Sequence, residues 1–177
     1  MDCVDTLCIA DHYNNRIRKI TSTGMAGRPE SGTVVSWANV RSRLRMGIYR
    51  ESLKDGAQVH QSPASPRHHQ RWRLIATSQV DGDILYRIEN VRSGKVLEVT
   101  DAQETAGAPV TQCAYAGIDA RHQQWRLIPV GPVTDTPQVF EIADHYSGLL
   151  LHVGTNALTQ HKADGDHRNR QWQLLPA

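Results

Sequence analysis

Histidine and cysteine are the residues of this sequence whose chemistry could support metal binding, but their spacing does not favour it. There are nine histidines, among them the adjacent His68 and His69. Neighbouring residues on a strand face opposite sides, and no HExxH or comparable cluster brings three ligands together. We therefore interpret the histidines as solvated loop residues and predict that the protein holds no metal and no cofactor.

Nucleophilic catalysis is not indicated either. The sequence contains no GxSxG elbow and no reactive-cysteine motif. Its three cysteines, Cys3, Cys8 and Cys113, are odd in number and lack CxxC spacing. Neither a disulfide framework nor a thiolate zinc site is expected from such a set. The sequence predicts a protein that is not an enzyme.

Composition excludes further classes. The chain of 177 residues fits one domain, or one domain with a short appendage. Its formal charge is only +2, with 21% charged residues. This charge gives no concentrated basic field, so nucleic acid is not an expected partner. No stretch approaches the ~20 apolar residues of a membrane helix, and the N-terminus lacks the pattern of a signal peptide. Composition indicates no oligomeric state.

A repeated phrase organises the chain. It reads HHQRWRL at 68–74, RHQQWRL at 121–127 and RNRQWQL at 168–174, with tryptophans 53 and then 47 residues apart. Such a period is typical of repeat architectures. Each copy follows a turn, an alternating segment and a short stretch that ends in glutamine. These glutamine-ended stretches are DGAQVHQ at 55–61, AGAPVTQ at 106–112 and NALTQ at 156–160.

The residues around each tryptophan alternate as in a half-buried strand. Trp72, Trp125 and Trp172 share a strand face with the leucine two residues later, while a polar residue between them faces the other way. We count four short strands per repeat, twelve in all, and no segment has a sustained helical stripe. The sequence predicts an all-β domain in which the three tryptophans are buried. Each would bury roughly 200 Å², worth on the order of 5 kcal/mol before entropy is subtracted.

The three Gln-x-Trp-like phrases, with SGKVLEVT and GAPVTQ between them, resemble the ricin B-type lectins over about residues 33–177. The resemblance implies a β-trefoil of three four-stranded units, which would lie at about 33–78, 79–131 and 137–177. Arg170 takes the place of the glutamine in the third unit.

The N-terminal segment has a different character. LCIADHYNNRIRKITSTGMAG, within residues 1–27, resembles a single NHL repeat, the unit that forms one blade of a β-propeller. We interpret residues 1–32 as an NHL-like fragment of strand, turn and strand, followed by a linker at 27–32. The alternative is an unrelated hairpin packed on the trefoil.

The lectin resemblance implies a sugar pocket in each unit, built from an acid, an aromatic platform and an amide. A carboxylate accepts two hydroxyl hydrogens, a ring covers the apolar face of a pyranose, and an amide both donates and accepts. Unit two supplies Glu98 as the acid and His122 with Gln123 at the amide position, beside the strand that ends at Gln112. Cys113 stands where the ring is expected, so Tyr115 is the substitute platform.

The other two units match the pattern less well. Unit three offers His152 for the acid, His161 for the ring and Asn169 at the amide position, with only Asn169 orthodox. Unit one offers Gly47 and Ser62, so both acid and platform are missing and we expect no binding there.

These residues predict weak monovalent binding of a glycan or polysaccharide, mainly through unit two. The alternative is a trefoil that has lost sugar binding and serves as a protein-interaction or structural module. In either case it could be the targeting module of a larger parent protein. A pocket shared by Glu98, Tyr115 and His122 favours the first, whereas a Glu98 paired with an arginine favours the second. The family resemblance implies an extracellular location.

Overall fold

The computed structural model describes residues 6–11, 16–21, 27–132 and 134–177, and the elements of this part are strands and short 3₁₀ turns. An N-terminal hairpin pairs β1 (Thr6–Asp11) with β2 (Arg16–Thr21) in antiparallel register. The two strands agree with the strands predicted for this segment, whereas the predicted turn at 12–15 lies outside the described residues.

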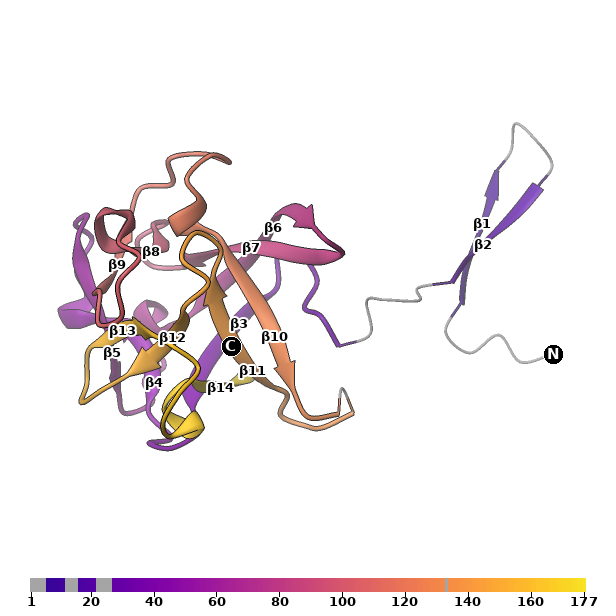
Figure 1. Cartoon of the computed structure of the whole chain (residues 1–177). Coiled ribbons are helices and arrows are strands. Elements are labelled where there is room, and N and C mark those ends of the chain that lie inside the picture. The colour runs from indigo at the N-terminus through magenta and orange to yellow at the C-terminus, as the bar shows by residue number, and fades with distance from the viewer. Residues whose placement is uncertain (1–5, 12–15, 22–26, 133) are drawn as a thin grey trace.

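Each predicted unit contains four strands (Figure 1). Unit one has β3 (Val34–Asn39), β4 (Arg45–Ile48), β5 (Ala57–Ser62) and β6 (Trp72–Val80). Unit two has β7 (Asp83–Asn90), β8 (Val96–Val99), β9 (Val110–Cys113) and β10 (Trp125–Val130). Unit three has β11 (Val139–Asp144), β12 (Leu150–Val153), β13 (Leu158–His161) and β14 (Gln171–Pro176). The 3₁₀ turns are η1 (Tyr49–Glu51), η2 (His68–Gln70), η3 (Thr100–Ala102), η4 (Arg121–Gln123) and η5 (His167–Asn169).

The first and last strands of each unit close a six-stranded barrel. Pairing runs from β3 to β6, β7, β10, β11 and β14, and β14 pairs with β3 again. The remaining strands form the hairpins β4–β5, β8–β9 and β12–β13, which gather at one end of the barrel (Figure 1). Because closure leaves no exposed barrel edge, short strands suffice. The predicted all-β trefoil is confirmed.

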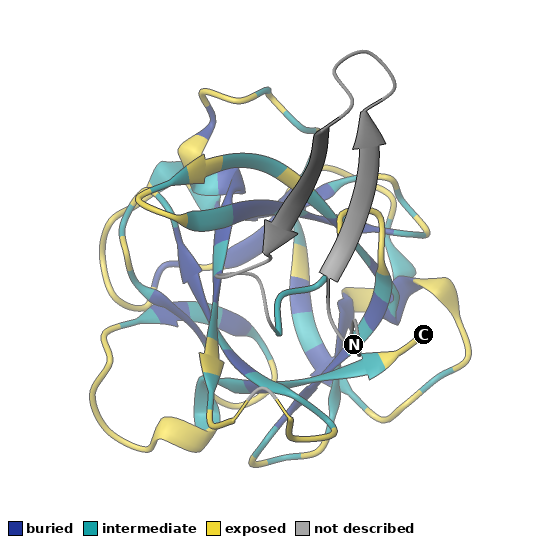
Figure 2. Cartoon of the chain, turned by 90° about the vertical axis from the view of Figure 1, so that its right-hand side faces the viewer, coloured by how far each residue is buried: buried dark blue, intermediate teal, exposed yellow. Residues whose placement is uncertain are grey.

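The three repeated tryptophans are equivalent and fully buried. Trp72, Trp125 and Trp172 are each 0% exposed, as predicted. Their indole Nε1 atoms each donate to a backbone carbonyl of the middle hairpin in the same unit. The acceptors are Met46 O at 3.0 Å, Leu97 O at 3.0 Å and Leu151 O at 3.1 Å. Each ring thereby links a hairpin to the barrel wall. Figure 2 shows that buried residues lie mainly on the strands of the barrel.

The glutamine one residue before the end of β5, β9 and β13 joins each unit to the preceding one around the barrel. Gln112 Nε2 donates to Ser52 O at 2.9 Å and to Lys54 O at 3.0 Å, both in unit one. Gln160 reaches two carbonyls of unit two in the same way, and Gln61 reaches Thr155 O of unit three at 2.7 Å. Since the pattern repeats around the axis, these buried amides link the units in a ring.

A second set of polar residues also links the units. Asn39 and Asn90 stand opposite Trp172 and Trp72 in register, and each side chain caps the turn that follows its strand. Their Nδ2 atoms donate to carbonyls of the neighbouring unit. The equivalent residue in unit three is Asp144. Ser147 donates to its Oδ2 at 2.8 Å, but its buried Oδ1 has no partner among the described residues.

Replacing Asp144 with asparagine is therefore expected to raise the free energy of unfolding at pH 7 by about 1–2 kcal/mol, because an amide supplies the missing donors. Burial, the largest influence, raises the pKa of Asp144, with hydrogen bonds from Ser147 opposing the shift. The ionised carboxylate thus destabilises the native protein above its raised pKa. This penalty disappears as the pH falls through that pKa toward the ordinary aspartate range, ~4.

Denaturant unfolding of both proteins between pH 4 and 8 measures the difference. The advantage of the asparagine variant should be largest near neutrality and should shrink toward pH 4. An advantage that does not change with pH, or a loss of stability, would contradict this account.

The segment that leads into the barrel packs against β6 and β7. Arg28 pairs with Asp83 at 2.5 Å, Tyr86 donates its hydroxyl hydrogen to Pro29 O at 2.7 Å, and Gly32 N donates to Leu74 O at 2.7 Å. From the sequence, a linker is predicted at 27–32. The contacts show instead that residues 28–32 belong to the packed body of the trefoil. Within the described residues, no helix has the length and apolar character to cross a membrane.

Candidate functional site

Glu98 of β8 occupies the centre of the unit-two site. Gln123 Nε2 donates to Glu98 Oε2 at 2.9 Å, and His122 Nε2 lies 3.7 Å from the same oxygen. Thr111 Oγ1 donates to the other oxygen at a longer 3.4 Å. Among the described residues, no Arg or Lys forms an ion pair with Glu98. The structure thus brings Glu98, His122 and Gln123 together around a carboxylate that no arginine or lysine neutralises.

Gln123 is held in place by the loop that follows β9. Its Nε2 also donates to Ala114 O at 3.1 Å, and its Oε1 accepts from Ala116 N at 2.9 Å. Gln70 makes the corresponding contacts in unit one, to Pro63 O and from Ser65 N. The repeated glutamine of the Gln-x-Trp phrase therefore fixes a loop, and in unit two it also orients the acid.

Cys113 is the last residue of β9, and Tyr115 follows it in the loop after that strand. The half-buried ring of Tyr115 stacks on Arg87, whose guanidinium carbon is 4.7 Å from the ring centroid. This cation–π contact covers part of one ring face. Burial raises the pKa of the Cys113 thiol, and the Glu98 carboxylate adds to the shift. The Cys113 thiol thus lies close enough to Glu98 for that charge to affect its pKa. Tyr115, in contrast, contacts Arg87 of β7.

Gln112 takes no part in this arrangement. It is 0% exposed, and its amide hydrogens go to the two unit-one carbonyls described above. Its Oε1 accepts from Ser93 Oγ at 2.7 Å. With its amide committed to these partners, Gln112 is a link between units, and we leave it out of the candidate site.

Unit three lacks a comparable acid. His152 and His161 occupy the acid and ring positions, with ring centroids 4.5 Å apart at an angle of 49°. Burial lowers the pKa of His152, and His161 and Arg170 lower it further. Arg170 itself pairs with Glu141 at 2.9 Å. Asn169 lies apart, at the boundary with unit one, where it contacts Arg41 and lines a cavity of about 380 Å³.

In unit one, side chains of the unit itself fill the position of the predicted sugar pocket. A Cβ at Gly47 would lie 2.8 Å from Gln70 Cγ and 3.1 Å from His69 Cδ2, so these two residues fill the space above the glycine. His69 is only 7% exposed. The interpretation of all the histidines as solvated loop residues is therefore wrong for His69, because Gly47 makes room for its ring. Among the described residues, no group of three or more His, Cys, Asp or Glu could hold a metal.

The closed barrel with three equivalent hairpins defines a β-trefoil, and the sequence places it in a family. The family described as ricin-type beta-trefoil lectin domain-like matches residues 25–113 and 68–163. The chain belongs to this family. Neither match extends upstream of residue 25, so the likeness of residues 1–27 to an NHL repeat stays a prediction.

Three solved structures illustrate the relationship. The designed threefold symmetric protein ThreeFoil is 29% identical with a TM-score of 0.69, over 81% of this chain and 99% of its own. An exo-beta-1,3-galactanase from Clostridium thermocellum is 22% identical with a TM-score of 0.71, over 84% of this chain and 31% of its own. A Polyporus squamosus lectin, bound to Neu5Acα2-6Galβ1-4GlcNAc, is 15% identical with a TM-score of 0.63, over 82% of this chain and 49% of its own. No curated protein sequence matches this chain.

Proposed function

We propose that this protein is a non-catalytic glycan-binding module whose site lies in unit two. The observation that carries the proposal is the environment of Glu98, a carboxylate oriented by Gln123 and left without an arginine or lysine partner among the described residues. A carboxylate of this kind accepts hydroxyl hydrogens from a polyol, and charge-assisted bonds of this type are the strong ones. His122 beside it supplies a further polar group.

The affinity of a single site should be low. Cys113 replaces a ring that would cover the apolar face of a sugar, and Tyr115 is partly covered by Arg87. Millimolar binding is worth only about 4 kcal/mol, so useful avidity would require several copies or attachment to a larger protein. The region of the galactanase that matches this chain is 31% of the galactanase, which supports the idea of a targeting module within a longer chain.

Replacing Glu98 with glutamine is expected to weaken binding of the best glycan about 10- to 100-fold, the value of hydrogen bonds to a charged group. A glycan array probed with the multivalently displayed protein would identify the ligand, and titration would follow. Glu104→Gln, an exposed acid of the same unit, is the matched control and should bind normally. Unchanged affinity in Glu98→Gln together with a loss in His161→Ala would move the site to unit three.

The second candidate function is a sugar-inactive trefoil that acts as a protein-interaction or structural module. The stacking of Tyr115 on Arg87 favours it, because this contact occupies the substitute platform. If the folded, multivalent protein binds no glycan on the array, and Tyr115→Ala binds none either, this second function replaces the first.

A further inference from the structure

The small net charge conceals an asymmetry between the units. Residues 33–78 contain eight Lys or Arg and two Asp or Glu, a formal charge of +6. The rest of the chain contains twelve Lys or Arg and sixteen Asp or Glu, a formal charge of −4. Unit one, which lacks the acid of a neutral sugar pocket, is therefore the basic part of the molecule.

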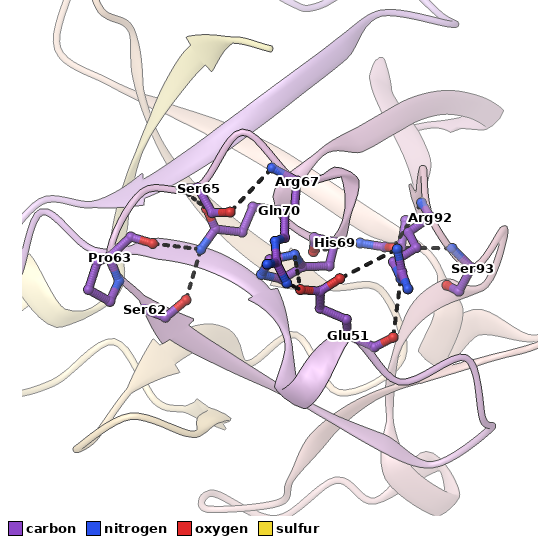
Figure 3. Close-up of polar contacts among 10 residues, drawn as sticks. Glu51, Ser62, Pro63, Ser65, Arg67, His69, Gln70, Arg92 and Ser93 are labelled. Carbon is purple, nitrogen blue, oxygen red and sulfur yellow. Dashed lines mark hydrogen bonds and ion pairs between the residues drawn. The ribbon is translucent and has the colours of Figure 1, made fainter.

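Part of this charge is concentrated around the turn η1 at the boundary with unit two. Arg67 of unit one and Arg92 of unit two converge on the single carboxylate of Glu51 (Figure 3). Arg67 binds Oε1, and Arg92 Nη1 lies 3.4 Å from Oε2. The hydrogen bond from Arg67 is the largest influence that lowers the pKa of Glu51. Two guanidiniums thus share one ionised carboxylate, which leaves an excess of positive charge.

Both guanidiniums remain available to a ligand. The Arg67 side chain is 68% exposed and that of Arg92 is 44% exposed. A guanidinium carries five N–H donors. Within the described residues, the Arg67 side chain donates only to Glu51, and the Arg92 side chain makes one hydrogen bond, from Nε to Glu51 O at 3.3 Å. Several donors of each group therefore point to solvent.

The same turn exposes an aromatic ring. Tyr49, the first residue of η1, is 44% exposed, and the Arg50 guanidinium carbon lies 5.1 Å from its ring centroid. Leu53, just beyond the turn, is 57% exposed. Arg50 covers part of one face of this ring, as Arg87 does for Tyr115. The exposed remainder lies on the same turn as the carboxylate that binds two guanidiniums, which suits an anionic pyranose because a ring covers the C–H face while guanidiniums bind an oxyanion.

The other two boundaries between units lack this excess. Arg92, two residues after Asn90, corresponds to Arg41 in unit one and Tyr146 in unit three. Arg41 forms an ion pair with Asp166 at 3.0 Å, and no second arginine forms an ion pair with that carboxylate among the described residues. Tyr146 is uncharged, and the turn η3 of unit two carries Asp101 where η1 carries Arg50. Asp83 and Glu89 of β7 are also each paired with two arginines. In the described part of the chain, the cluster at Glu51 differs from these in lying at a turn between units and in the greater exposure of its two arginines.

We propose that the surface around the turn η1, which carries the exposed Tyr49 and holds Arg67 and Arg92 at Glu51, binds an anionic group of a glycan, either a sulfate ester or a uronic acid carboxylate. This second site does not depend on Glu98. Its cations surround one turn and do not form the long stripe that a run of phosphates requires. A charged sugar is therefore a better fit than a nucleic acid.

Titration of the full chain with defined polymers tests the proposal. The probes are dextran sulfate for sulfate alone, polygalacturonate for carboxylate alone and dextran for neither. Arg67→Gln/Arg92→Gln should bind the preferred anionic polymer at least tenfold more weakly, from the loss of charge-assisted hydrogen bonds. Glu51→Gln should bind it several-fold more tightly, because the substitution frees both guanidiniums from their internal carboxylate. These opposite effects separate a binding role from loss of folding, which unfolding curves of each variant also monitor.

Arg41→Gln/Arg43→Gln removes the same charge from unit one and is the matched control. An equal loss in this control would mean general charge attraction and would overturn the proposal. So would binding of neither anionic polymer by the wild type and by Glu51→Gln, or tighter binding of a single-stranded oligonucleotide of matched charge. Glu98→Gln should retain binding of the anionic polymer, so failure of the unit-two site and failure of this one are distinguishable.

Discussion

Replacing Trp125 with alanine is expected to lower the free energy of unfolding by about 3–5 kcal/mol. The indole is 0% exposed, so its removal leaves a cavity in a core that the three units share. It also leaves Leu97 O, the acceptor at 3.0 Å, without its donor. Since a domain of this kind is stable by roughly 5–15 kcal/mol in total, the variant should be close to unfolding at 37 °C.

Chemical denaturation of the wild type and the variant measures the change. Trp125→Phe keeps most of the ring volume but loses the N–H donor, and it should cost less than the alanine substitution. Tyr115→Ala removes a half-buried ring from the same unit and serves as the control for loss of an aromatic residue. A cost below about 1 kcal/mol for Trp125→Ala would contradict the shared core.

The core could be predicted because its signal repeats. One tryptophan followed by a leucine says little, but three copies at a similar period require three equivalent positions, and the closed barrel supplies them. Some of the residues that link the units are also repeated in the sequence. NVRS occurs at 39–42 and again at 90–93, and its asparagine caps a turn in both places. The repeated asparagine could have predicted that Asp144 is the exception.

The sites were harder to predict because they depend on contacts between distant residues. His69 is buried only because Gly47, 22 positions earlier, has no side chain. The tyrosine offered as a platform is positioned by Arg87 of another strand. A net charge of +2 gave no hint that Arg67 and Arg92 meet at one carboxylate. The spacing of residues along the chain does not predict these contacts.

The sequence distinguishes two outcomes for Glu98, either a pocket shared with Tyr115 and His122 or an ion pair with an arginine. The structure fits neither completely. Glu98 is not paired with an arginine or lysine in the described part of the chain, which removes the reason to regard it as a structural ion-pair partner. Its neighbours are His122 and Gln123, but Tyr115 is held by β7. The polar half of a sugar site is thus assembled, whereas the apolar half is weak, and this is the physical reason to expect low affinity.

Gln112 is the residue whose role changes most between sequence and structure, and replacing it with leucine is expected to cost about 2–4 kcal/mol of unfolding free energy. The substitution removes the donors to Ser52 O and Lys54 O and the acceptor for Ser93 Oγ. Each buried polar group left without a partner costs about 1–3 kcal/mol, and the turn carbonyls recover part of this from water. Leucine fits the volume, so the loss is one of hydrogen bonds.

Gln58→Leu is the matched control, because Gln58 is exposed on the neighbouring strand β5 and pairs in register with Thr111. It should change stability by less than about 0.5 kcal/mol. Gln61→Leu and Gln160→Leu should resemble Gln112→Leu, since they occupy the same position in the ring of units. If Gln112→Leu instead keeps the stability of the wild type but loses glycan binding, then Gln112 contacts the ligand and the link between units is dispensable. A stability loss in all three variants would establish that this repeated glutamine joins the units of the trefoil.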